Sequence, residues 1–251
     1  MSGHSKWATI KHKKAATDAK RGKIFTQVAR ELTIAAREGG GNPEFNFRLR
    51  LAVDKAKSVN MPKENIERAI QRGTGELKGE ELSEVTYEGY APHGVALLVT
   101  VLTDNKNRTV ADVRRVLTRQ GGSMADAGAV AWQFERKGYI AISANGVDPE
   151  AIFEAAVEAG ADDVIISDDM VEVFAPLEAF QEVRQALANL GVTFDAAELS
   201  FIPKTTLHLE DEQALKVMGV INALEELDDV QQVYSNLDIS DELVAKFEAM
   251  Q

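Results

Sequence analysis

The chain has 251 residues, of which 45% are hydrophobic and 27% charged, with a formal net charge of −12. This length and composition allow two or three compact domains and exclude wholesale disorder. Because cysteine is absent, disulfides, thiolate nucleophiles and thiolate metal ligands are excluded, which fits a reducing cytosol. No apolar run approaches the roughly 18–20 residues that cross a bilayer, so we expect a cytoplasmic protein without a membrane partner.

The charge is unevenly distributed along the sequence. Residues 1–75 carry 16 Lys/Arg against 7 Asp/Glu, whereas residues 139–251 carry 4 against 24. Binding to a polyanion depends on the local field rather than on the total charge. The first part of the chain should therefore attract polyanions and the last part should repel them.

Basic residues are densest before residue 24, where large apolar side chains are limited to Trp7 and Ile10. Such a segment should bury little surface, so we expect an exposed arm or a helix largely open to solvent. Its basic residues are Lys6, Lys11, Lys13, Lys14, Lys20, Arg21 and Lys23.

Three amphipathic helices are predicted next. Apolar residues from Phe25 to Ala36 recur with a period of 3.6, and the glycines at 39–41 end this helix. A second helix follows over 45–59 and carries Arg48 and Lys55, and a third runs from Pro62 to about Gly73. Short connections between short helices indicate a small helical bundle.

Beyond residue 79 the pattern becomes a mixture of strands and helices. Strands are predicted at 95–102, 129–134, 139–143, 164–166, 171–174, 199–202 and 230–234, and helices at 109–120, 149–159, 177–190 and 212–227. We therefore expect an α+β protein: an N-terminal three-helix bundle and two ferredoxin-like, split βαβ domains. The predicted domains are a basic helical domain (1–78), a discontinuous α+β domain (79–137 with 204–240) and an acidic α+β domain (138–203).

No catalytic site emerges from the sequence. His4, His12, His93 and His208 share no metal-ligand spacing. The glycine clusters match neither phosphate-binding motif and lie where helices stop, and paired acids such as Asp162-Asp163 are typical of solvated loops. We expect no enzymatic activity, no cofactor and no metal.

The basic N-terminal region predicts nucleic-acid binding. Lysine and arginine neutralise phosphates, and Trp7 could stack on an unpaired base or pack on the bundle. Further cations on the second and third helices either extend this surface or form an ordinary solvated face. The predicted nucleic-acid-binding residues are Lys6, Trp7, Lys11, Lys13, Lys14, Lys20, Arg21, Lys23, Arg48 and Lys55.

Several motifs closely resemble the YebC family, and the resemblance extends over essentially the whole chain. They are Gly3-His4-Ser5-Lys6-Trp7, Ile10-Lys11-His12-Lys13-Lys14-Ala15-Ala16, Asp18-Ala19-Lys20-Arg21-Gly22-Lys23, Asn60-Met61-Pro62-Lys63, Arg72-Gly73-Thr74-Gly75, Tyr87-Glu88-Gly89-Tyr90-Ala91-Pro92 and Thr103-Asp104-Asn105. One departure is Phe47, where the family pattern has proline.

The resemblance implies a cytoplasmic, non-enzymatic protein with one helical and two α+β domains that binds DNA and regulates transcription. Other members of the family look like translation factors, so a ribosome-associated factor binding ribosomal RNA is the alternative. Both roles require phosphate binding, and charge alone does not choose between duplex DNA and RNA. The acidic domains could present a face to the ribosome or to a protein partner.

Overall fold

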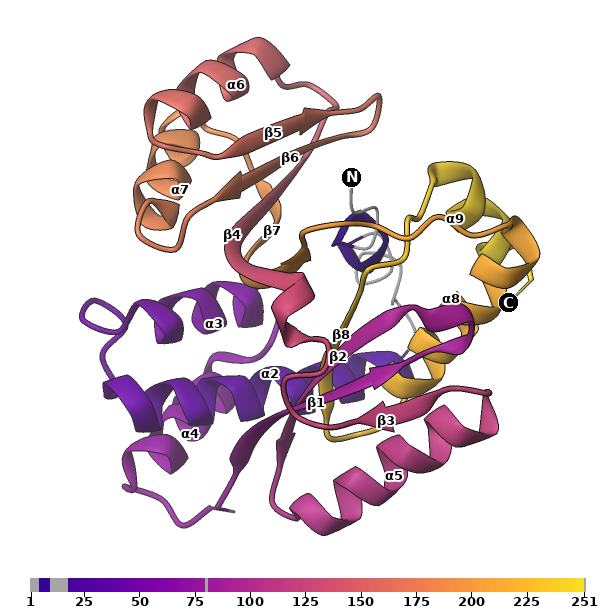
Figure 1. Ribbon diagram of the computed structural model, residues 1–251. Helices are drawn as coiled ribbons and strands as arrows, with labels where there is room; N and C mark the ends of the chain where they lie inside the picture. The colour runs from indigo at the N-terminus through magenta and orange to yellow at the C-terminus, as the bar shows by residue number, and fades with distance from the viewer. Residues whose placement is uncertain (1–4, 10–17, 80, 251) are drawn as a thin grey trace. The chain divides into compact units, whose positions relative to one another are not determined.

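The structure is a computed structural model that describes residues 5–9, 18–79 and 81–250 (Figure 1). The described chain forms two compact units. The larger unit comprises the described residues from 18 to 132 together with 207–250, and the smaller unit comprises 5–9 and 133–206. Each unit contains one four-stranded antiparallel sheet, so the predicted α+β class is confirmed. The division into three domains stays a prediction.

The helical bundle opens the larger unit. It consists of α2 (Asp18–Gly39), α3 (Phe47–Ser58) and α4 (Lys63–Thr74). Leu32, Leu49 and Ala52 are fully buried in its core, as the apolar periodicity predicts. Asn46 fixes the entry to α3, because its side chain accepts a hydrogen bond from the Leu49 amide and donates one to a carbonyl of α2. Phe47, the departure from the YebC pattern, is the first residue of α3.

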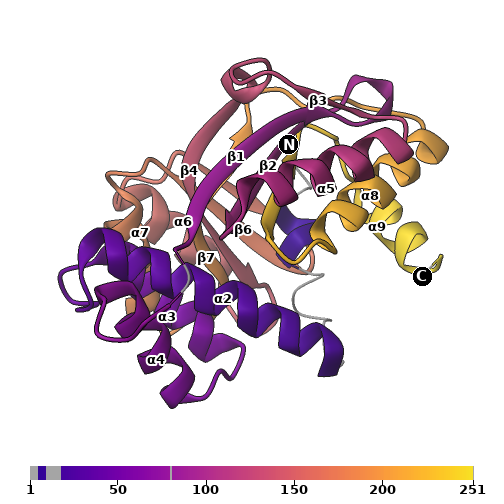
Figure 2. The same cartoon turned by 90° about the horizontal axis from the view of Figure 1, so that it is seen from below.

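The sheet of the larger unit is discontinuous in sequence. Strands β1 (Ser83–Tyr90), β2 (Ala96–Thr103), β3 (Ser123–Ala125) and β8 (Val230–Ser235) pair in the order β3-β1-β2-β8. The hairpin strands β1 and β2 are central, and β8 arrives after the whole smaller unit. Helices α5 (Lys106–Arg119) and α8 (Asp211–Glu225) lie side by side along this sheet, followed by α9 (Asp241–Glu248) (Figure 2).

One predicted strand is wrong. Residues 129–134 do not form a strand; a 3-10 turn, η2 (Ala131–Gln133), leads into the long strand β4 (Phe134–Ser143). The cause is Glu88, whose buried carboxylate accepts hydrogen bonds from the backbone amides of Gly128, Val130 and Ala131 at 2.6–2.9 Å. A side chain therefore takes the donors that a strand would give to a neighbour. Neither β3 nor α9 is predicted by the sequence pattern.

The smaller unit has the split βαβ order. Strand β4 is followed by α6 (Pro149–Glu158), β5 (Asp163–Ile166), β6 (Met170–Ala175), α7 (Phe180–Asn189) and β7 (Phe194–Pro203), with sheet order β5-β6-β4-β7 (Figure 1). Gly138 lets α7 approach β4 closely, because a Cβ there would lie 2.1 Å from the Phe180 ring. No helix among the described residues is long and apolar enough to cross a membrane.

Residues 5–9 are helical and buried in the smaller unit, so the expected exposed arm is wrong for this part of it. Trp7 is 3% and Lys6 6% exposed. The Lys6 ammonium lies 2.8 Å from the Asp169 carboxylate, which satisfies the buried charge and lowers the pKa of Asp169. Tyr139 lies on the sheet face opposite α7, where its side chain bonds with Thr9 and Glu172. Helix 5–9 therefore covers this second face.

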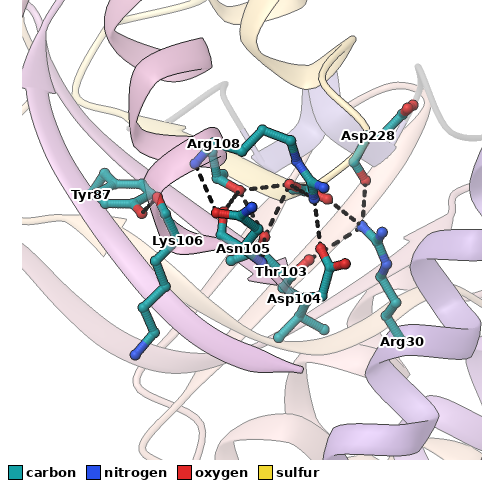
Figure 3. A network of polar contacts seen from close by, with 11 residues as sticks. Arg30, Tyr87, Thr103, Asp104, Asn105, Lys106, Arg108 and Asp228 are labelled. Carbon is teal, nitrogen blue, oxygen red and sulfur yellow. Dashed lines mark hydrogen bonds and ion pairs between the residues drawn. The ribbon is translucent and has the colours of Figure 1, made fainter. Parts of the chain in front are cut away.

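A buried carboxylate connects the bundle to the sheet within the larger unit (Figure 3). Asp229, 6% exposed, precedes β8 and accepts hydrogen bonds from Thr109 at 2.6 Å and Thr103 at 3.1 Å. Arg108 of α5 and Arg30 of α2 form ion pairs with it at 2.8 and 2.9 Å. The Asp229 network, meaning these five residues, therefore holds two helices and two strand ends together.

Replacing Trp7 tests the docking of helix 5–9. Loss of a fully buried indole leaves a cavity, so Trp7→Ala should lower the free energy of unfolding by about 3 kcal/mol or more. The chain offers a matched control in its second tryptophan, Trp132, which is 68% exposed; Trp132→Ala should change stability by less than about 0.5 kcal/mol. Urea unfolding followed by circular dichroism measures both. Equal stability of the two variants would contradict the docked helix.

Replacing Asp229 tests the network that joins bundle and sheet. Asp229→Ala leaves two arginines and two hydroxyls without their acceptor, which should cost roughly 3–5 kcal/mol. Its neighbour Asp228 is exposed and contributes only a backbone carbonyl to Arg30, so Asp228→Ala should be nearly neutral. Thermal unfolding of the pair separates the network from ordinary surface charge, and a similar loss in both variants would refute its role.

Acid should weaken the same network. Burial alone raises the pKa of Asp229, but hydrogen bonds from Thr109, Arg108 and Thr103 and the charge of Arg30 outweigh it, so the pKa lies below the ordinary value. A lowered folded-state pKa contributes stability above the unfolded-state pKa, about 4, and loses it as pH falls through the folded-state value. The urea midpoint of the wild type should therefore fall more steeply below about pH 4 than that of Asp229→Asn. Parallel pH profiles would contradict this assignment.

Candidate nucleic-acid interface

A groove lies between α2 and α4 in the larger unit. It encloses about 750 Å³, and the linker that leads from α4 to β1 contributes its remaining wall. Helix α2 lines it with residues spaced along one face, and α4 does the same. The lining residues are Phe25, Thr26, Ala29, Arg30, Thr33, Met61, Asn65, Arg68, Ala69, Arg72, Lys78, Gly79 and Leu82.

The two helices are fixed against each other beside this groove. A Cβ on Gly73 would lie 2.3 Å from the Thr33 carbonyl oxygen and 2.8 Å from the Ala36 side chain, so glycine permits the close approach. The Thr33 hydroxyl also lies 3.1 Å from the carbonyl oxygen of Ala69. The walls of the groove are therefore set by backbone contacts rather than by flexible side chains.

The described residues that line the groove carry positive charge and no negative charge. Arg68, Arg72 and Lys78 are exposed and form no ion pair with any described residue. None of the lining residues is acidic. Arg68 and Arg72 are four residues apart on α4, which places both guanidinium groups on the same side of the helix. We call these three residues the cationic rim.

A fourth cation at the groove, Arg30, is already bonded to other groups of the protein. Arg30 lines the groove but donates hydrogen bonds to the carbonyl oxygens of Leu102 and Asp228 and pairs with Asp229. Figure 3 shows Arg30 reaching this network from α2. The Asp229 network therefore anchors the wall of the groove that α2 provides.

The structure separates the predicted binding residues into distinct groups. Lys6 and Trp7 are buried in the smaller unit, which does not fit a phosphate-binding arm. Arg48 forms ion pairs with Glu38 at 2.6 Å and with Glu84 at 2.8 Å. Lys55 forms an ion pair with Glu31 at 3.1 Å. Both cations are therefore already paired with carboxylates. The pKa of Arg48 is raised because Glu84 and Glu38 outweigh the opposing effect of its burial.

The rest of the predicted set belongs to the chain around the start of α2. Lys20, Arg21 and Lys23 fall in its first two turns, where Lys23 is half-buried and the side chains of the other two lie outside the described residues. Lys11, Lys13 and Lys14 also lie outside the described residues. Helix geometry brings Lys23 within one turn of Thr26, which lines the groove.

Sequence reasoning did not single out the cationic rim. Arg68 and Arg72 are two of many cations on the predicted helices, and Lys78 falls at the end of the helical domain. The signal that the sequence offered for Arg68 and Arg72 was their spacing of four residues, which places both on one side of a helix. What distinguishes them is that neighbouring cations have carboxylate partners, which depends on tertiary contacts from α2 and β1.

Metal chemistry has no support in the described part of the chain, where no group of three or more His, Asp or Glu side chains could hold an ion. The groove contains no histidine or carboxylate either. Its chemistry is that of hydrogen-bond donors and fixed positive charge, which suits an anionic ligand.

Comparison with known proteins identifies relatives over the whole chain. Residues 5–76 match the TACO1/YebC protein N-terminal domain, and residues 82–237 match the TACO1/YebC second and third domain. A protein of Dictyoglomus turgidum named "Probable transcriptional regulatory protein" is 54% identical, covering 97% of this chain and 98% of its own. A protein of Trichlorobacter lovleyi with the same name is 53% identical over 96% of this chain and 97% of its own.

A solved structure supports the same relationship. The crystal structure of a conserved hypothetical protein from Aquifex aeolicus is 49% identical in sequence and matches with a TM-score of 0.83. The match covers 89% of this chain and 93% of that one. With family models and relatives that agree over nearly the full length, the chain belongs to the TACO1/YebC family.

Proposed function

We propose that this protein is a non-catalytic, cytoplasmic transcriptional regulator that binds DNA through the cationic rim of the α2–α4 groove. The observation that carries the proposal is the presence of three exposed cations without described ion-pair partners around a groove whose described lining residues include no acid. The names of the curated relatives point to transcription regulation. An arginine guanidinium group can bind phosphate oxygens through two parallel hydrogen bonds.

The basic residues that precede the groove extend the proposed interface. Lys20 and Arg21 lie in the first turn of α2, and Lys11, Lys13 and Lys14 precede that helix. Phosphate contacts from such residues position a protein on nucleic acid without reading its sequence. Lys23 is left out of the proposed interface because its ammonium nitrogen is buried. Lys6 and Trp7 are left out of the proposed interface because both are buried.

The charge of the acidic smaller unit supports different roles for the two units. Its ion pair between Lys6 and Asp169 occupies a cation of the basic segment, and most of its charged residues are acids that phosphates repel. We infer that this unit keeps nucleic acid on the larger unit and is available to a protein partner. Ribosomal RNA remains the competing target, since a phosphate-binding groove serves either nucleic acid.

Removing the cationic rim should reduce the salt dependence of binding. The triple variant Arg68→Ala, Arg72→Ala, Lys78→Ala should reduce the slope of log K against log salt on duplex DNA by about 2 to 3, because each phosphate contact contributes about 0.9. The triple variant should weaken binding to all DNA sequences alike. Fluorescence anisotropy with labelled duplexes at several salt concentrations gives the slope.

A matched triple variant controls for the loss of three charges. Lys57, Lys63 and Arg119 are exposed on the same unit but lie outside the groove lining, so replacing them with alanine should change the slope by less than about 1. Equal effects of the two triple variants would show that binding follows net charge and would refute the groove as the site. Titrations with an RNA hairpin of equal length decide between the DNA and RNA targets.

The preceding basic residues can be tested separately. Lys13→Ala with Lys14→Ala should reduce the duplex slope by about 1 to 2 if both reach phosphates, again equally for all sequences. Stability should not change, and circular dichroism verifies this. An unchanged slope would restrict the interface to the groove itself.

A further inference from the structure

The groove combines two kinds of surface that a simple phosphate clamp does not need. Part of its lining is apolar and includes the half-buried side chains of Phe25 and Ala29 and the buried side chains of Met61 and Leu82. The cationic rim and the exposed Asn65 lie among the other lining residues. A ligand that matches both surfaces must itself carry an apolar plane and a negative charge.

The size of the groove restricts what can enter it. About 750 Å³ lies within the range of about 300–1,000 Å³ typical of pockets that enclose one small molecule. In a duplex, bases are stacked between the two backbones and their flat faces are covered. A base can present its face to a protein side chain only when it is unpaired and unstacked.

From this combination we propose that the groove binds one unpaired nucleotide of a nucleic-acid chain. Its base packs against Phe25, and the flanking phosphates bind Arg68, Arg72 and Lys78. The Asn65 amide can donate to and accept from a base edge. This inference rests on the proposed function, since it specifies that the same groove binds an unpaired nucleotide.

The test compares two DNA duplexes with the same base pairs, one fully paired and one that carries a single additional, bulged nucleotide. Wild-type protein should bind the bulged duplex about tenfold more tightly, the order expected for one base stacked on an aromatic ring. With 2-aminopurine as the bulged base, binding should quench its fluorescence, which reports stacking directly. Anisotropy and fluorescence are measured on the full chain.

Variants of the apolar lining of the groove should remove the preference for the bulged duplex. Phe25→Leu keeps an apolar side chain in the bundle but loses the ring, so the tenfold preference should fall to about twofold or less. Ala29→Met fills the groove without removing any aromatic or cation and should have the same effect. Phe45→Ala is the matched control, because Phe45 is 87% exposed on the same bundle and lies outside the groove.

The outcomes separate this inference from the proposed function. Equal wild-type affinity for the two duplexes, or a bulged base that stays fluorescent, would overturn nucleotide capture while leaving phosphate binding in place. A preference that survives both Phe25→Leu and Ala29→Met would also overturn it. If wild-type protein binds neither duplex, or if loss of the cationic rim changes nothing, the proposed function itself fails.

Discussion

The position of helix α2 depends on one buried carboxylate. Asp229 lies where the chain enters β8, and four side chains from α2, α5 and the end of β2 donate to it. A buried carboxylate with a single donor would be costly, but here the number of donors makes the charged form the stable one. Since β8 follows the smaller unit in sequence, the contact of Asp229 with Arg30 joins residues that are 199 positions apart in the chain.

This arrangement explains why the candidate site is rigid. Arg30 lines the groove and is also a ligand of Asp229, and Gly73 brings α4 against the carbonyl of Thr33 on the same helix. The two walls are thus fixed independently, one by the network and one by backbone packing. Fixed walls lower the entropy that the backbone loses on binding, so the ordering cost falls mainly on the exposed side chains of the cationic rim.

Local sequence patterns predicted most of the elements but not their tertiary environment. Helical periodicity located α2, α3 and α4 to within a few residues at most ends, and alternation located the split βαβ order of the smaller unit. The strand predicted at 129–134 failed because Glu88, forty residues earlier, takes its backbone donors. The burial of Lys6 was not predicted for a similar reason, because Asp169, which forms its ion pair, is distant in sequence. Nor could charge counting distinguish Arg48, which is paired, from Arg68, which is not.

The charges of the bundle give a physical reason to regard the groove as functional. On α3, Arg48 and Lys55 each have a carboxylate partner, so they serve the fold. Like charges four residues apart on a helix, such as Arg68 and Arg72, are destabilising by about 0.2–0.5 kcal/mol. The last turn of α4 offsets this for Arg72 through the helix dipole, and Glu64, four residues before Arg68 on the same helix, offsets it for Arg68. Arg68, Arg72 and Lys78, by contrast, have no ion-pair partner among the described residues, and all three line one groove, an arrangement that favours an anionic ligand there.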